Sequence, residues 1–230
     1  MAYINSHKKI KSILNGLNIN KIYFNVEPEP SPFDRYFQEV EYIESNGSGD
    51  LGYQYIDTNY IATPNTSAEY EFMYTSPIAT YGRHILSGQN YYFPLLRKLS
   101  NSQLFMWRGN LYLQTYFNPQ SNIKYKFEAW RTNENKVIVN NVSYGVVSNS
   151  GATDDSKNLY LFAYNNNGNA GMQAIGRLYS CKIYEGENLV RNFIPCYRKS
   201  DGEIGLYDLV NDVFYTNQGS GAFTKGADVN

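Results

Sequence analysis

The sequence contains few of the residues that build metal and redox centres. Its 230 residues include two cysteines, Cys181 and Cys196, and two histidines, His7 and His84. Structural zinc sites draw their four ligands mainly from these two residue types, so a zinc site is not expected. Both cysteines are expected to be free, buried thiols, as in proteins that assemble in a reducing cytoplasm.

Charge of either sign is also scarce. Charged residues make up 18% of the chain and the formal net charge is -1. Without a surplus of basic residues there is little to attract a phosphate backbone, so nucleic acid is not an expected partner. No apolar stretch reaches transmembrane length, and the first residues, MAYINSHKKIKSILNG, lack the apolar centre and cleavage site of a signal peptide. Neither membrane insertion nor export is therefore expected.

Aromatic residues, in contrast, are abundant. They make up 16% of the chain, with 23 tyrosines, 12 phenylalanines and two tryptophans. Tyrosine favours β-strands, and it also favours recognition surfaces because it offers a large area and a hydroxyl at low entropic cost. We assign most of the tyrosines to half-buried strand positions and a minority to recognition.

The residues from 175 to 225 show the strand pattern most clearly. Two apolar-rich runs, Leu178–Tyr184 and Asn188–Ile194, are joined across Glu185-Gly186-Glu187, which predicts a β-hairpin. Turns are expected at 200–202 and 211–212. Further short runs of this kind lie at 40–44, 52–58, 68–75, 85–87, 91–93, 104–107, 111–117, 125–131, 136–140 and 159–164. Many short strands without a convincing helix predict an all-β protein of two packed antiparallel sheets.

The predicted hairpin also decides whether the cysteines are neighbours. If Glu185 pairs with Asn188, Cys181 lies opposite Asn192 and not opposite Cys196. A disulfide between the cysteines would then need a different register.

Several of these strands carry a family resemblance. They are Leu189–Gly202 (LVRNFIPCYRKSDG), Ile204–Asp208 and Phe214–Asn217, with Tyr42–Ser45 and Gln54–Thr58 as opening strands and Leu159–Ala163 as a middle strand. Together they resemble the concanavalin A-like, or laminin-G-like, jelly-roll modules on virion and surface proteins of phages that infect gut bacteria. The resemblance covers roughly residues 36 to 225. It implies a jelly-roll β-sandwich over residues 36–230, and it says little of the ligand because the fold hosts many functions.

The N-terminal residues are predicted to form a separate arm. Asn15-Gly16 favours a tight hairpin turn within residues 1–25. A lone hairpin is marginal in water, so its apolar side chains need a partner surface. These are Ile13, Leu14, Leu17, Ile19, Ile22 and Phe24. They either pack on the jelly roll as edge strands or, as we prefer, dock on another virion protein or form a homotrimer. Residues 26–35 are proline-rich and are expected to be an extended linker.

The most sugar-like cluster lies in a predicted hairpin. Trp107, Arg108, Asn110 and Tyr112 combine aromatic rings with an arginine and an amide, which match the apolar faces and the hydroxyls of sugars. The alternative, with Trp107 in the core, stays open.

An asparagine-rich stretch at 165–169 is the second candidate site. Asn165 and Asn167 belong to an amide-rich loop that is able to bind glycans, or calcium together with Asp154 and Asp155. A plain flexible turn is the alternative. No other cofactor is implied.

Catalysis has little support in the sequence. A glycoside hydrolase needs two carboxylates that face each other. Glu69 and Glu71 share a strand face, but no third acid follows them, and a solvated face is the preferred interpretation. Arg191, Arg198, Asp201 and Asp208 are expected to hold the scaffold together.

The sequence thus predicts a non-catalytic phage virion protein, assembled in the host bacterial cytoplasm, that attaches to bacterial or mucosal surface glycans. The alternatives are a capsid or tail decoration protein without glycan binding and, less favoured, a polysaccharide-degrading enzyme. An adhesin needs exposed aromatic rings without paired acids, whereas a decoration protein needs an extensive apolar interface.

Overall fold

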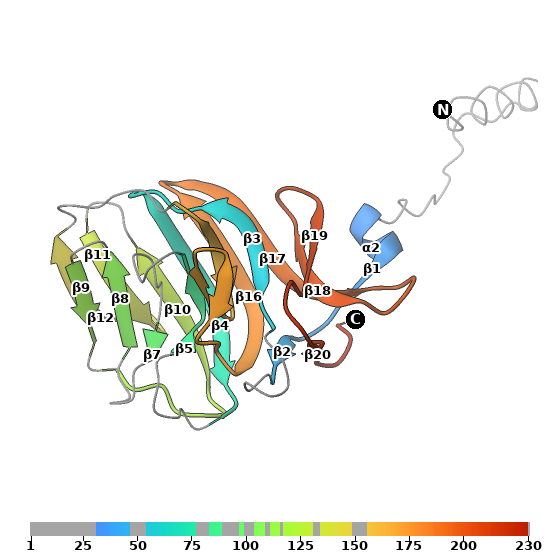
Figure 1. The fold of residues 1–230 in the computed structure, drawn as a ribbon, viewed down its shortest axis with the longest axis horizontal. Coiled ribbons are helices and arrows are strands. Elements are labelled where there is room, and N and C mark those ends of the chain that lie inside the picture. The colour runs from blue at the N-terminus through green and yellow to red at the C-terminus, as the bar shows by residue number, and fades with distance from the viewer. Residues whose placement is uncertain are drawn as a thin grey trace, which may run out of the picture. The chain divides into compact units, whose positions relative to one another are not determined.

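The structure is a computed structural model that describes residues 31–46, 54–76, 83–88, 97–98, 104–108, 111–115, 117–130, 134–148 and 156–229. The chain divides into two units between Ser31 and Pro32. The predicted N-terminal hairpin with Asn15-Gly16 and the predicted strand at 91–93 lie outside the described residues. The second unit is nearly all β, as predicted (Figure 1).

The larger layer is an antiparallel sheet in which the main strand order is β12-β11-β10-β4-β16-β17-β18-β19. These strands are β12 (Val142–Ser148), β11 (Glu134–Val139), β10 (Lys124–Trp130), β4 (Thr66–Tyr74), β16 (Gly176–Glu185), β17 (Asn188–Arg198), β18 (Ile204–Asp208) and β19 (Val213–Thr216). Three short strands join this sheet at its side: β1 (Phe37–Glu39), β2 (Ile43–Ser45) and β20 (Thr224–Lys225).

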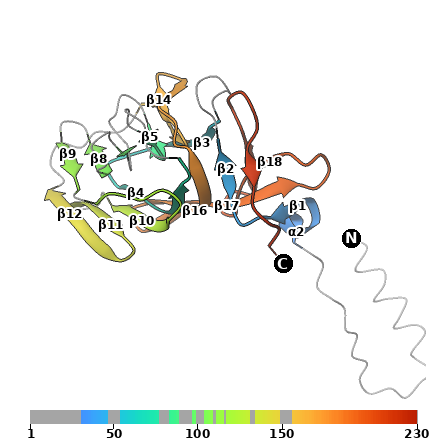
Figure 2. The same cartoon turned by 90° about the horizontal axis from the view of Figure 1, so that it is seen from below.

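The second layer consists of three smaller antiparallel sheets. They are β3 (Ile56–Ile61) with β13 (Asn158–Leu161) and β6 (Leu86–Ser87); β14 (Tyr164–Asn166) with β15 (Asn169–Gly171); and β5 (Arg83–His84), β7 (Arg97–Lys98), β8 (Leu104–Arg108) and β9 (Leu111–Gln114). Figure 2 shows the two layers face to face, with β3, β5, β8 and β9 above β16, β4, β10, β11 and β12. This arrangement is the jelly-roll β-sandwich that the sequence predicts.

The core lies between these layers because the strands alternate. In β4, Ala68, Tyr70 and Phe72 are buried, whereas Glu69 and Glu71 between them are only half-buried. Burying one face of each strand supplies most of the stabilising apolar area. The side chains of the two layers meet in one cluster that includes Ile43, Ile56, Leu86, Phe127, Leu161, Phe162, Leu178, Ile183, Phe193, Leu206 and Phe223.

The β16–β17 hairpin confirms the predicted turn and corrects the predicted register. Glu185 pairs with Asn188, and Gly186 at the turn has a φ of 59°, which glycine adopts without strain. A register shift follows between Ile183 and Tyr184, so Cys181 lies opposite Phe193 and not opposite Asn192. One extra residue in a strand displaces every later pair by one position. Both cysteines are free and buried, as expected.

The predicted linker does not extend to residue 35. Residues Pro32–Tyr36 form the short helix α2, with Pro32 at the first position, where a helix tolerates the missing N–H. The Phe33 ring lies 5.0 Å from that of Tyr207, and the Phe37 ring lies 4.9 Å from that of Phe214. The folded unit therefore begins at Pro32, before the predicted boundary at residue 36, because aromatic packing holds α2 on the sheet.

The first strands of the unit are held from two sides, in an arrangement that we call the terminal clasp (residues 37–45 with residues 224–229). On one side β1 pairs with β17, and Val40 N–H donates to the Pro195 carbonyl over 3.0 Å. On the other side Val229 N–H donates to the Glu39 carbonyl over 3.0 Å, and β2 pairs with β20. The clasp ties both ends of the unit into the large sheet.

Several elements were not predicted from the sequence. They include strands β7, β12 and β20, and the β14–β15 hairpin, whose tip was interpreted as a loop. Within the described ranges, no helix has the length and apolar character needed to cross a membrane.

Candidate functional site

The predicted sugar-binding cluster lies on the β8–β9 hairpin, and its register divides the cluster. Trp107 pairs with Tyr112, so these two positions belong to one face of the hairpin. Arg108 pairs with Leu111 and therefore belongs to the opposite face. The register thus separates the position of Arg108 from the positions of Trp107 and Tyr112, and a binding role for these residues stays a prediction. Asn110 lies outside the described residues.

The asparagine-rich stretch forms the tip of the β14–β15 hairpin. Asn166 pairs with Asn169 across Asn167 and Gly168, whose φ values are 56° and 96°. Two positive φ values in a two-residue turn define the type I′ hairpin that Asn-Gly favours. Figure 2 shows β14 projecting from the second layer, away from the large sheet. Asn167 is exposed at this tip, and a binding role for it stays a prediction.

Asn165 has a structural role that the sequence did not predict. Its side chain is 2% exposed. The Nδ2 group donates to the Asn158 carbonyl over 2.9 Å, and Oδ1 accepts a hydrogen bond from Gly168 N–H over 2.7 Å. The Asn165 amide therefore stabilises the hairpin, and a ligand-binding role for it stays a prediction.

A second polar surface lies on β3 and β13, and we call it the tyrosine–amide face (Tyr55, Asp57, Asn59, Asn158 and Tyr160). Asp57 pairs with Tyr160 across the two strands, which puts both on the same side of the small sheet. The rings of Tyr55 and Tyr160 lie 4.6 Å apart with an interplanar angle of 33°. Burial, together with Tyr55 and Asp57, raises the pKa of Tyr160 to about 12.

The polar groups of this face are connected to one another. Asp57 Oδ1 accepts a hydrogen bond from Asn59 N–H over 2.8 Å, and Oδ2 accepts one from Asn158 Nδ2 over 3.2 Å. Asn158 Nδ2 also donates to Asn59 Oδ1 over 3.3 Å. The Tyr160 hydroxyl donates to the Gly168 carbonyl over 3.3 Å, which connects the face to the tip of the β14–β15 hairpin.

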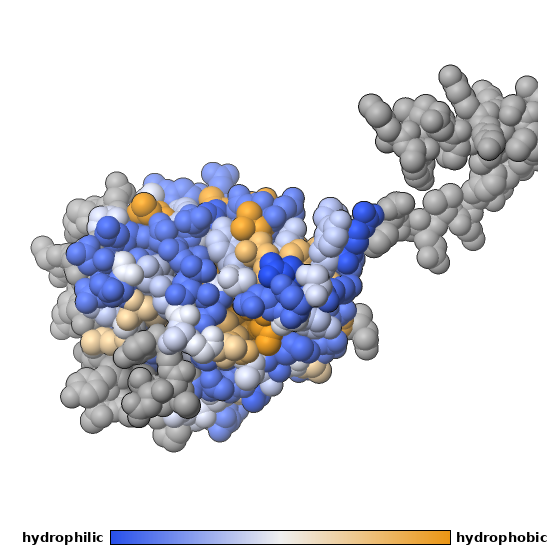
Figure 3. All heavy atoms as spheres, turned by 45° about the vertical axis from the view of Figure 1, so that its right-hand side comes forward, coloured by the Kyte–Doolittle hydropathy of each residue, from blue (hydrophilic) through white to orange (hydrophobic). Residues whose placement is uncertain are grey.

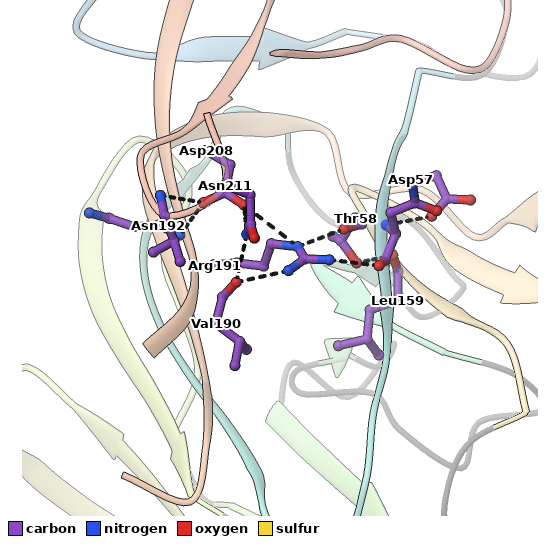
Figure 4. Close-up of polar contacts among 10 residues, drawn as sticks. Asp57, Thr58, Leu159, Val190, Arg191, Asn192, Asp208 and Asn211 are labelled. Atoms are coloured by element: carbon purple, nitrogen blue, oxygen red, sulfur yellow. Dashed lines mark hydrogen bonds and ion pairs between the residues drawn. The ribbon is translucent and has the colours of Figure 1, made fainter. Parts of the chain in front are cut away.

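Strand β3 is fixed from behind by Arg191 of β17. Its Nε donates to the Thr58 carbonyl over 3.0 Å, and Nη2 donates to the Asn59 carbonyl over 2.7 Å. Figure 4 shows the guanidinium between β3 on one side and Asp208 with Asn211 on the other. Arg191 thereby joins the two layers at the strand that carries Asp57 and Asn59.

Asp208 balances the charge of Arg191. Its carboxylate is fully buried and lies 3.6 Å from the Arg191 Nε. It accepts hydrogen bonds from Asn192 N–H over 2.9 Å, from Val210 N–H over 3.0 Å and from Asn211 Nδ2 over 2.6 Å. A buried charge persists only when it is paired and hydrogen-bonded in this way. The scaffold role predicted for Arg191 and Asp208 is confirmed, whereas Arg198 and Asp201 form a local ion pair at the surface.

Another pair of tyrosines lies on the outer side of the large sheet. We call it the capped-tyrosine face (Tyr42, Tyr179, Arg177 and Lys124). The two rings meet edge to face, with centroids 5.4 Å apart. Arg177 lies over the Tyr42 ring at 4.3 Å, and Lys124 lies over the Tyr179 ring at 4.8 Å. Both rings therefore already have a cation as partner.

Comparison with known proteins supports the fold. Neither a protein-family model nor a curated protein matches the sequence. Among solved structures, the chain is similar to a protein of Bacteroides ovatus described as a "putative carbohydrate binding protein", with a TM-score of 0.58 and 12% identity over 84% of this chain. The chain spans 62% of that protein's length. A heptameric SAP-like pentraxin of Limulus polyphemus gives a TM-score of 0.47 and 10% identity, over 64% of this chain and 76% of the pentraxin. Both are jelly-roll, lectin-like folds.

Three carboxylates of β4 and β16 are engaged in the scaffold. Glu71 pairs with a lysine of β10 over 2.8 Å and Glu69 with another over 3.7 Å, which confirms a solvated strand face. Glu185 accepts hydrogen bonds from the hydroxyls of Tyr60 and Thr63, each over 2.6 Å. Burial and this carboxylate raise the pKa of Tyr60 to about 12. These acids stabilise strand ends and sheet faces.

No metal centre is formed by the described part of the chain. Within it, no group of three His, Cys, Asp or Glu side chains is placed to hold an ion. The predicted calcium ligands Asp154 and Asp155 lie outside the described residues. A shallow depression of about 190 Å³ lies between the loop at 201–204 and the loop at 217–223. Two of its polar side chains are already in use, because Asp201 pairs with Arg198 and Asn217 donates to the Gly221 carbonyl.

Sequence reasoning missed all five residues of the tyrosine–amide face. Three of the five could have been grouped from the sequence alone. Tyr55, Asp57 and Asn59 alternate along one strand, so their side chains share one side of it. The other two, Asn158 and Tyr160, come from a strand about 100 residues later, and only the fold brings them alongside.

Proposed function

We propose that the jelly roll binds carbohydrate without catalysing a reaction. The observation that carries this proposal is the structural likeness to the Bacteroides ovatus protein, whose description names carbohydrate binding. The engagement of Glu69, Glu71 and Glu185 in the scaffold supports the absence of catalysis, because a glycosidase needs two carboxylates free to face its substrate.

The proposed binding surface is the outer side of the second layer. This layer carries the β8–β9 hairpin with Trp107 and Tyr112 on one face and the projecting β14–β15 hairpin with Asn167 at its tip. Aromatic rings stack on the apolar side of a sugar, and amides form paired hydrogen bonds with its hydroxyls. Both kinds of residue occur in this layer.

We further propose that the protein is a phage virion component held on the particle by residues 1–25. The resemblance of Leu189–Gly202 to phage surface modules supports this, and bacterial or mucosal surface glycans are then the target. In this proposal the apolar side chains from Ile13 to Phe24 dock on another virion protein or form a homotrimer.

A decoration protein without glycan binding is the alternative. It is favoured by three aliphatic side chains at the β18–β19 turn, Leu209, Val210 and Val213, which are 42–44% exposed. Figure 3 shows apolar colour only in small, separate areas of the face it presents, within a hydrophilic surface. The glycan-binding proposal is preferred because the structural likeness to a protein described as carbohydrate-binding supports it.

The test is binding of the full chain to an array of bacterial and mucin glycans, with and without calcium. We expect selective binding that Trp107→Ala weakens at an unchanged melting temperature. Tyr42→Ala, on the outer side of the large sheet, is the matched control. No binding by the folded protein would favour the decoration role.

The anchor is tested separately by deletion of residues 1–31. The truncated protein is expected to keep glycan binding and to lose incorporation into particles. Continued incorporation would contradict the anchoring role without affecting the binding proposal.

A further inference from the structure

We propose that the tyrosine–amide face is itself a sugar subsite, which takes a neutral hexose or N-acetylhexosamine residue. This inference rests on the proposed carbohydrate-binding function and adds a contact region that lies apart from the β8–β9 hairpin. It is argued from the ring pair, from the free polar groups beside it and from the charge of the face.

The ring pair offers a supported aromatic surface. Tyr55 is half-buried and stacks on Tyr160, which is 5% exposed and fixed by its hydrogen bond to the Gly168 carbonyl. Among the residues that the structure describes, no cation lies over the Tyr55 ring, in contrast to the rings of Tyr42 and Tyr179. A rigid ring that has no cation over it is a feature against which the C–H groups of a sugar stack.

The polar groups beside Tyr55 retain hydrogen-bonding capacity. Asn59 Oδ1 and both protons of Asn158 Nδ2 are used within the face. Asn59 Nδ2 and Asn158 Oδ1 form no hydrogen bond with the described residues, and the Asp57 carboxylate accepts only two. Asn59 Nδ2 can donate a hydrogen bond, and Asn158 Oδ1 and the Asp57 carboxylate can accept further ones. These groups match adjacent hydroxyls of a sugar, because each hydroxyl both donates and accepts.

The charge of the face selects against acidic sugars. Asp57 has no ion-pair partner among the described side chains. Arg191, on β17 behind β3, is paired with Asp208 and donates to backbone carbonyls. A uronic or sialic acid carboxylate would therefore approach Asp57 without a neutralising cation, and like charges repel most strongly where water is excluded.

The face is also held in one geometry before any ligand arrives. Arg191 fixes the carbonyls of Thr58 and Asn59 from behind, and Asp57 holds the Asn59 backbone N–H from the front. Groups that are already ordered lose little entropy on binding, which favours affinity.

The experiment is an amide-resolved NMR titration of the full chain with three free sugars: galactose, N-acetylglucosamine and glucuronic acid. We expect the neutral sugars to shift the side-chain amide signals of Asn59 and Asn158, and glucuronic acid to shift them much less. Asp57→Asn is expected to reduce this discrimination because it removes the negative charge. Saturating neutral sugar that leaves both signals unmoved overturns the proposal.

Two variants and one control complete the test. Tyr55→Ala is expected to weaken binding of the neutral sugars about tenfold, as loss of an aromatic contact does. Asn59→Gly, which keeps the backbone at a φ of 52°, removes the amide without strain and is expected to weaken binding even if Tyr55→Ala is poorly folded. Tyr179→Ala is the matched control and should bind as the parent does; equal effects of Tyr55→Ala and Tyr179→Ala would overturn the subsite.

The two proposals fail in different ways. Array binding that Trp107→Ala abolishes, combined with unmoved Asn59 and Asn158 signals, overturns the subsite and keeps the carbohydrate-binding function. Absence of binding to every glycan and sugar overturns both.

Discussion

The described part of the chain carries two pairs of touching tyrosines with different surroundings. Tyr55 and Tyr160 lie on the second layer, 4.6 Å apart, beside a carboxylate and two amides. Tyr42 and Tyr179 lie on the large sheet, 5.4 Å apart, with a guanidinium over one ring and an ammonium over the other. On the large sheet each ring of the tyrosine pair thus makes a contact with a cation, whereas on the second layer no described cation lies over the Tyr55 ring. What neighbouring strands place over a ring decides its role.

The strand register explains the difference. On the large sheet, Arg177 of β16 pairs with Glu44 of β2 over 2.9 Å, and Lys124 of β10 pairs with Glu71 of β4 over 2.8 Å. These ion pairs hold the cations where they cover the rings. Around Tyr55, the adjacent positions on β3 and β13 carry Asp57, Asn59 and Asn158, which bond to one another instead.

The largest expected effect comes from removing the Arg191 guanidinium, which holds β3 from behind. Arg191→Met leaves the fully buried Asp208 carboxylate without its cation and two carbonyls of β3 without donors. Loss of one partner of a buried ion pair costs about 3–5 kcal/mol in the free energy of unfolding. Urea denaturation measures this loss, and binding at the tyrosine–amide face should fall while the capped-tyrosine face stays intact.

Arg198→Met is the matched control for Arg191→Met. Arg198 pairs with Asp201 at the surface, where solvent screens the charges, so the urea midpoint should hardly change. Equal destabilisation by the two variants would show that Arg191 is not a special link between the layers.

A smaller effect is expected at alkaline pH. The pKa of Tyr160 is raised to about 12 from the ordinary value of 10.0, mainly by burial. The folded state holds the proton of the Tyr160 hydroxyl more tightly than the unfolded state does. The contribution of this hydroxyl to the free energy of unfolding is therefore complete below about pH 10 and is lost as the pH rises toward about 12. The unfolding midpoint of Tyr160→Phe should therefore decline less steeply with pH than that of the parent. Parallel curves for the two proteins would mean that Tyr160 does not titrate in this window.

The contact of Arg177 with the Tyr42 ring, in the capped-tyrosine face, is measurable as a coupling energy. A double-mutant cycle of Arg177→Met and Tyr42→Leu should give a coupling of about 0.5–1 kcal/mol, the usual range for a partly exposed cation–π contact. Arg177→Met combined with Tyr55→Leu, in different layers and without a shared partner, should be additive. Coupling in the second cycle would remove the distinction between the two faces.

The smallest effect on stability is expected at the tip of the β14–β15 hairpin. Asn167 has a φ of 56°, which glycine adopts freely, so Asn167→Gly should change the free energy of unfolding by no more than about 0.5 kcal/mol. Asn167→Ala should cost about 1 kcal/mol, because alanine is strained in this region. Thermal unfolding separates the two. Any loss of glycan binding in Asn167→Gly then reports on the amide alone.

Much of the scaffold could be predicted from the sequence because its signals are local. The alternation of Tyr70 and Phe72 with Glu69 and Glu71 predicted β4 and its buried face, and Glu185-Gly186-Glu187 predicted the hairpin that follows β16. Strand existence was easier to predict than register. Nothing near Val190 indicates the extra residue that moves Phe193 opposite Cys181.

The helix α2 and the tyrosine–amide face were not predicted, for different reasons. The prolines favoured an extended linker over residues 26–35. However, the rings of Phe33 and Phe37, four residues apart, pack on the sheet and hold the end of this segment as the helix α2. For the surface, Trp107 and Arg108 are neighbours in sequence but lie on opposite faces of a strand. Asp57 and Asn158, in contrast, are distant in sequence and meet only through the pairing of β3 with β13.

The terminal clasp has a mechanical consequence. Tension applied to the chain ahead of Pro32 would reach the sandwich along residues 37–45, which are bonded to β17 on one edge and to residues 224–229 on the other. A strand pulled along its length loads its ladder of hydrogen bonds together, so they must break at once and not one after another. The unit would therefore resist a force on its N-terminal end by the shear strength of these strands.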